Sequence, residues 1–87
     1  MSSKAIGNRA HAEGEETIAN GDASHTEGYK TETVGFYSHA EGQETKATGM
    51  FAHAEGKMTQ AIGDGAHAEG QSTVANEINT HAEGLLS

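Results

Sequence analysis

The chain has 87 residues, with five Lys and Arg against thirteen Asp and Glu, and its formal net charge is −8. It contains no Cys, which excludes disulfide frameworks and thiolate chemistry, and its acidity disfavours nucleic acids and anionic membranes as partners. No apolar run approaches the roughly 20 residues of a membrane span. Hydrophobic residues make up 33% of the chain and fourteen of them are Ala. Because ordering costs roughly 1.5 kcal/mol per residue, this composition excludes a conventional self-sufficient globule.

A repeat of seven residues runs from Lys4 to the end of the sequence. The first heptads, 4–10 and 11–17, both read x-Ala-x-Gly-x-x-small, and the pattern continues through twelve heptads. Gly fills the fourth slot in eleven of them, and Glu77 is the exception. Every second heptad opens with His-Ala-Glu-Gly, or with His-Thr-Glu-Gly at His25, so all six His recur at intervals of 14 residues. We therefore predict a single repeat domain over residues 1–87, with repeats over about 4–87.

The small residues at fixed slots favour a β-solenoid over a coiled coil or a disordered chain. A coiled coil needs large apolar residues where this heptad has Ala and Gly, and disorder does not explain a strict register. In each x-Ala-x triplet the Ala points to one face of a strand and its neighbours to the other, and we expect each Gly to turn the chain with a positive φ. Where Glu77 replaces Gly, we expect Asn76 to adopt that conformation.

Two heptads form one turn in this interpretation, and six turns stack with parallel strands. At about 4.8 Å per turn the roll is roughly 29 Å long. The seventh slot also points inward, where only Ala, Ser and Thr fit. The Thr column in this slot therefore does not form an exposed ice-binding face; its members are Thr17, Thr31, Thr45, Thr59 and Thr73.

The repeat resembles the YadA-like head domain of trimeric autotransporter adhesins, most closely at residues 5–7 and 61–63, which both read Ala-Ile-Gly. The resemblance implies a left-handed parallel β-roll, a side-by-side homotrimer, and an adhesive role in virulence at the cell surface. Host matrix proteins or cell-surface receptors are the implied partners. Residues 38–42, Ser-His-Ala-Glu-Gly, are also similar to repeats of phage tail fibres, which implies a virion tail as the alternative location. Because this sequence shows no stalk, neck or membrane barrel, we expect it to be a head segment that does not itself contact a membrane.

Each turn has two outward faces, and one of them carries the same pair of residues in every turn. We expect this His and Glu face to lie at the three-fold interface, where His of one chain hydrogen-bonds Glu of the next. On the opposite face the residue types vary from turn to turn. If that face lay at the three-fold interface instead, it would bury its aliphatic residues, which are Ile6, Ile18, Val34, Ile62 and Val74. The predicted interface residues are His11, Glu13, His25, Glu27, His39, Glu41, His53, Glu55, His67, Glu69, His81 and Glu83.

Metal ligation is a more specific alternative to the interface role of the same histidines. His and Glu are good ligands for Zn, Ni or Cu, and a trimeric roll with metal in its His and Glu columns is the third functional hypothesis. Packing explains uniformity along the whole chain more simply, so we expect no metal and no cofactor. A catalytic role is also not expected, because no unique nucleophile departs from the repeat.

Aromatic residues and Met gather in the corner slots that follow Gly. Phe36, Tyr37, Met50 and Phe51 fall at one corner of neighbouring turns, and Tyr29 falls at the opposite corner. Exposed aromatic residues are enriched at interfaces, so this group is a candidate adhesive patch. Packing between protomers at the corners is the alternative.

Overall fold

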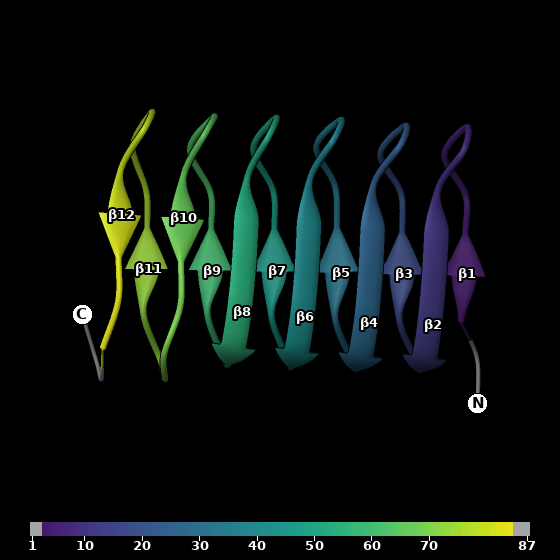
Figure 1. Cartoon of the computed structure of the whole chain (residues 1–87), viewed down its shortest axis with the longest axis horizontal. Coiled ribbons are helices and arrows are strands. Elements are labelled where there is room, and N and C mark those ends of the chain that lie inside the picture. Colours follow the sequence, from purple (N-terminus) through teal and green to yellow (C-terminus); the bar gives the residue numbers. More distant parts are fainter. Residues whose placement is uncertain (1–2, 85–87) are drawn as a thin grey trace.

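The chain forms a β-solenoid of two parallel sheets, seen in a computed structural model that describes residues 3–84 (Figure 1). The described residues contain no helix, and therefore none that could span a membrane. One sheet contains β1 (Lys4–Ala5), β3 (Ile18–Ala19), β5 (Glu32–Thr33), β7 (Lys46–Ala47), β9 (Gln60–Ala61) and β11 (Val74–Ala75). The other contains β2 (His11–Glu15), β4 (His25–Tyr29), β6 (His39–Gln43), β8 (His53–Lys57), β10 (His67–Ala68) and β12 (His81–Ala82).

Successive turns are in register, so residues 14 apart in the sequence lie side by side. His11 pairs with His25 and Ala5 with Ala19, and the same offset continues along both sheets. In Figure 1 the chain climbs along the rear strands and descends along the front ones while it advances from right to left. This winding is left-handed, and the long axis measures 29 Å with a thickness of only 10 Å. The predicted left-handed parallel β-roll of about six turns is confirmed.

The interior is a thin layer of methyl and hydroxyl groups. Ala40, Ala47, Ala54 and Ala61 are completely buried, as is Thr26, which takes an Ala slot. The seventh slot is buried too, which confirms that the Thr column is not a surface feature; its buried members are Thr17, Thr31, Thr45, Thr59 and Thr73. Most of these hydroxyls bond to nearby backbone, as Thr45 does to the carbonyl of Glu41 at 3.1 Å. The small side chains therefore fill the roll and largely satisfy their own polar groups.

Glycine is required in the fourth slot because neighbouring turns approach too closely for a side chain. A Cβ built on Gly63 would lie 2.2 Å from the carbonyl oxygen of Glu77 in the next turn. The same collision, at 2.0–2.2 Å, recurs at every fourth-slot Gly from Gly7 to Gly70. Real Cβ atoms do not tolerate such distances from backbone, so this slot excludes every residue with a side chain wherever another turn follows.

The expectation that each Gly turns the chain with positive φ is right for only one of the two sheets. The six glycines of the His-x-Glu-Gly segments have φ between 106° and 110°. Gly7, Gly21, Gly35, Gly49 and Gly63 do not have positive φ, and their role is close approach alone. The prediction for Asn76 is wrong for the same reason, because this column needs no left-handed residue. Glu77 takes its place in this column with an ordinary backbone φ.

The chain bends instead at the second residue after the fourth slot, which adopts a left-handed conformation at both corners from Arg9 to Asn79. The φ values there lie between 55° and 71°, although only one of the residues is Gly. Their amides join ladders along the roll; Phe51 N, for example, donates to Phe36 O at 2.9 Å. This bonding offsets the 1–2 kcal/mol that a left-handed conformation costs a residue with a Cβ. The residues are Arg9, Glu16, Ala23, Lys30, Tyr37, Glu44, Phe51, Met58, Gly65, Ser72 and Asn79.

Substitution in the fourth slot tests the close approach of the turns. We expect Gly63→Ala to lower the free energy of unfolding by about 3 kcal/mol, because its Cβ would overlap the Glu77 carbonyl. Glu77→Ala is the matched control in the same column and should change stability by less than about 0.5 kcal/mol. Urea unfolding followed by circular dichroism measures both, and equal effects would contradict the role given to this column.

Substitution at a corner tests the left-handed residues. Met58 has φ 56°, so Met58→Gly should raise the free energy of unfolding by about 1 kcal/mol. Lys57→Gly, one residue earlier in β8, should lower it by roughly 0.5–1 kcal/mol, because Gly weakens a strand. Opposite signs in the same urea experiment would support the corner geometry, whereas destabilisation by Met58→Gly would argue against it.

Candidate functional site

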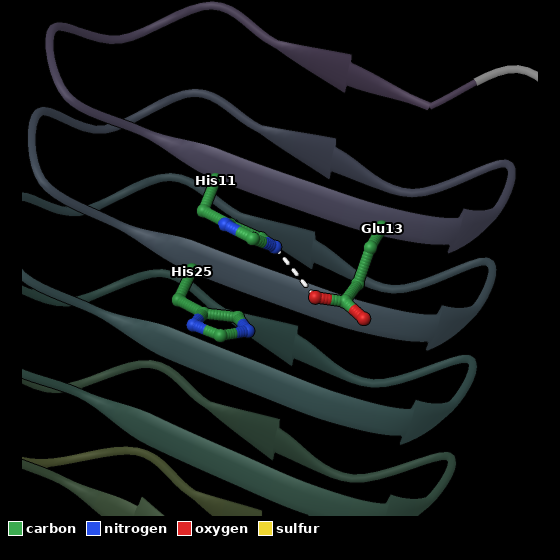
Figure 2. A group of neighbouring side chains, drawn as sticks. All are labelled: His11, Glu13 and His25. Atoms are coloured by element: carbon green, nitrogen blue, oxygen red, sulfur yellow. Dashed lines mark hydrogen bonds and ion pairs between the residues drawn. The ribbon is translucent and has the colours of Figure 1, made fainter.

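The sheet of β2, β4, β6, β8, β10 and β12 carries a column of His and a column of Glu along its outer face. Register places His11 beside His25 and Glu13 beside Glu27. Figure 2 shows His11, Glu13 and His25 in the first turns of this sheet. We call the two columns the His–Glu ladder; its members are His11, Glu13, His25, Glu27, His39, Glu41, His53, Glu55, His67, Glu69, His81 and Glu83.

The imidazole rings of the ladder are stacked on one another. Centroids of successive rings lie 4.6–4.7 Å apart, and the rings from His25 onward are within 9° of parallel. The first pair, His11 and His25, is tilted by 25°. Strand spacing sets the ring spacing, so the stack follows from the parallel register.

Each His contacts the Glu two residues later in its own turn. The distances between Nε2 and Oε1 are 2.5–2.7 Å in all six pairs. The pairs of His11 and His25 are hydrogen-bonded. At His39, His53 and His67 the Nε2 atom is shielded from solvent, and the carboxylate oxygen lies close but outside hydrogen-bonding alignment. The sequence indicated a partner from another chain, whereas the structure provides one within the same turn.

The ladder holds many carboxylates in a narrow column, which has an electrostatic cost. Like charges directly opposite each other on neighbouring strands are destabilising, and the Glu column repeats this arrangement at every turn. In the central turns the Glu side chains are 38–41% exposed, so solvent screens each His contact and limits its contribution to about 0–1 kcal/mol. Additional hydrogen-bond donors or cations beside the carboxylates would therefore stabilise this face.

Five sets of potential metal ligands lie along the ladder. Each set combines a His, its Glu and the His of the next turn, with the ligand atoms within 4.8 Å of one another. The first set is His11, Glu13 and His25, drawn in Figure 2, and the others repeat it by 14 residues. Imidazole nitrogen and carboxylate oxygen suit Zn²⁺ and related ions.

Comparison with protein families identifies the repeat. The sequence model of the YadA head domain repeat matches two copies, at residues 3–28 and 54–76, which together exceed half of the chain. The chain belongs to the YadA head domain repeat family. Searches of curated proteins and of solved structures gave no match. The family confirms the resemblance seen in the sequence, and the ladder is the feature of this YadA-type roll that needs a functional explanation.

The opposite sheet of the roll has a mixed outer face. Its aliphatic side chains include Val34, Ile62 and Val74, which are each 38–40% exposed, and Ile6, which is 62% exposed. Polar contacts lie between them, such as the bond from Asn20 Nδ2 to Glu32 Oε2 at 3.2 Å. This face therefore lacks the uniform chemistry of the ladder.

The predicted aromatic group lies on the surface at one corner. Phe36, Tyr37, Met50 and Phe51 are 41–61% exposed, and the Tyr37 and Phe51 rings stack with centroids 5.2 Å apart. Tyr37 and Phe51 both occupy left-handed corner positions, which aim their side chains away from the interior. These four residues form the corner patch.

Tyr29 marks the end of β4 and interacts with its neighbour Lys30. The Lys30 ammonium lies 5.3 Å from the centre of the Tyr29 ring. Interaction with Tyr29, and more weakly with Glu16, raises the pKa of the fully exposed Lys30. Lys30 therefore keeps its positive charge throughout the neutral range, near the carboxylates of Glu16 and Glu44.

Sequence reasoning located the ladder and the corner patch but missed how the ladder pairs. The spacing of two residues indicates a common face, yet it does not show that the His and Glu side chains reach each other on one strand. The left-handed corner residues were also missed. Asn79 and Gly65 are the signals that were available, because both types tolerate positive φ.

Proposed function

We propose that this chain is an adhesive head segment of a trimeric surface fibre, in which three rolls pack side by side. The observation that carries the proposal is the uniform His–Glu ladder along a rigid roll. Membership of the YadA head family supports it, and favours it over the alternative of a phage tail-fibre segment. On this proposal the chain is structural and adhesive rather than enzymatic, and it acts at the cell surface.

The thinness of the roll supports assembly. The molecule is 10 Å thick, and its interior holds only Ala, Ser and Thr, so each sheet has an outer face without cover from the same chain. A roll this thin gains further burial only by packing against other copies. A closed three-fold arrangement covers one face of each copy and leaves the other for partners.

Uniformity favours the ladder as the covered face. In a symmetric trimer each layer would bring together three His and three Glu, with the same contacts repeated in every layer. The carboxylates of Glu41, Glu55 and Glu69 remain 38–40% exposed, so donors from a neighbouring chain would be able to reach them. The mixed face has no repeated chemistry of this kind.

Charge substitution distinguishes the two faces. We expect the parent chain to sediment at three times its 9.0 kDa mass. Replacing His39 and His53 by Lys should produce monomers, because desolvating two added ammonium groups per chain costs several kcal/mol. Replacing Val34 and Ile62 by Lys, on the opposite face, should leave the trimer intact.

The reverse result would place the aliphatic face at the three-fold axis. A folded parent monomer would overturn the trimer itself. Circular dichroism of each variant separates loss of assembly from loss of the roll.

The corner patch is the surface we propose for adhesion to host matrix proteins or cell-surface receptors. Its four residues are exposed on one chain and lie at a corner rather than on the ladder face. Aromatic side chains supply large contact areas at interfaces, and here the backbone holds two of them in a stack.

A matched pair of double variants tests the patch. Phe36→Gln with Phe51→Ser should weaken binding to immobilised matrix proteins or host cells at least tenfold, or about 1.4 kcal/mol. Gln43 and Ser72 occupy the equivalent slots at the opposite corner, so both side chains are compatible with a corner of the roll and the fold should persist. Ile78→Gln with Met58→Ser makes equivalent changes outside the patch and should leave binding unchanged. Equal binding by both variants would contradict the assignment.

A further inference from the structure

We infer that the His–Glu ladder binds transition-metal ions such as Zn²⁺ at three sites per chain, each made by a pair of adjacent His and the Glu between them. The inference replaces the metal-free ladder expected from the sequence, and it does not rest on the adhesive function. It starts from the five sets of ligands along the ladder, in which neighbouring sets share a His.

The chemistry of imidazole limits how many sets are occupied together. A neutral imidazole that ligates through Nε2 has one lone pair there, so each His serves one ion. Of the five sets, three share no residue, and they account for all six His of the chain. These are His11, Glu13 and His25; His39, Glu41 and His53; and His67, Glu69 and His81.

Electrostatics also favours alternate occupancy. Ions in neighbouring sets would be separated by about one strand spacing, roughly 4.8 Å, and would repel strongly. Alternate sets double this separation to roughly 10 Å, close to the Debye length at physiological salt. The Glu column and the net charge of −8 attract cations to the face.

Binding requires the paired rings to tilt toward each other. In a tetrahedral site, zinc–nitrogen bonds of 2.0–2.1 Å place the two nitrogens about 3.3 Å apart. The centroids of the stacked rings are 4.6–4.7 Å apart, so the two Nε2 atoms of a pair must approach each other by roughly 1.3 Å, which rotation of the two partly exposed side chains provides. The central His side chains are 33–37% exposed, and the Nε2 atoms of His39 and His53 have no aligned hydrogen bond to break.

The bound ion keeps an open coordination position. Two imidazoles and one carboxylate supply three ligands, and water completes a tetrahedral zinc site. If the ladder face packs against other chains, a donor from the neighbouring chain takes the place of this water. The number of ions per chain is the same in both cases.

The number of ions bound is the first test. Isothermal titration of the full chain with Zn²⁺, without a polyhistidine tag, should give three ions per chain. Any other limiting number of ions per chain would overturn the paired sites. Six ions would indicate one ion at each His–Glu contact, and no ions would indicate a ladder that does not bind metal. Excess Ca²⁺ should not displace the zinc, because imidazole is a poor ligand for calcium; displacement would show binding to carboxylates alone.

Two triple variants with the same composition provide the sharper test. Replacing His25, His53 and His81 by Asn leaves no two adjacent His, so zinc binding should be lost. Replacing His53, His67 and His81 by Asn leaves three consecutive His and should retain one ion per chain. Equal binding by both would overturn the proposal. Circular dichroism without metal confirms that each variant keeps the roll, so loss of sites is distinguished from loss of fold.

Discussion

The close approach of successive turns is the constraint on which this structure depends. Backbone of one turn occupies the space where a side chain on the fourth-slot Gly of the previous turn would lie, as at Gly42 and Gly56. The same compactness limits the interior to Ala, Ser and Thr. Stability therefore comes mainly from parallel backbone ladders and many small contacts, which explains how a chain with so few large apolar residues folds.

Parallel stacking turns each residue choice into a column. A single His on a strand would be an ordinary surface residue, but six in register form a continuous stack of rings beside a continuous row of carboxylates. Columns amplify both benefit and cost, since a favourable contact and a like-charge repulsion are each repeated in every turn. The ladder is therefore the face with the strongest chemical character in the described roll.

The surfaces divide the proposed functions between them. The ladder provides repeated donors and acceptors suited to assembly or to metal ions, and these roles are compatible because an ion bound there keeps a position for a ligand from another chain. The corner patch lies away from the ladder, on residues whose left-handed backbone directs them outward. On the proposed function, the interior sets the length of the roll while its separate outer surfaces make the contacts with partners.

The sequence by itself determined the repeat, the inward and outward slots, the six-turn roll and the identity of the ladder, because strict periodicity converts directly into stacking. It did not determine the backbone at Tyr37 or Phe51, since side chains of these types rarely adopt positive φ and only ladder bonding between turns holds them there. It also assigned positive φ to Gly7 and Gly21, where the tertiary structure requires absence of a Cβ instead. The pairing of His39 with Glu41 on one strand was likewise decided in three dimensions, because side-chain reach depends on how the neighbouring turns orient the rings.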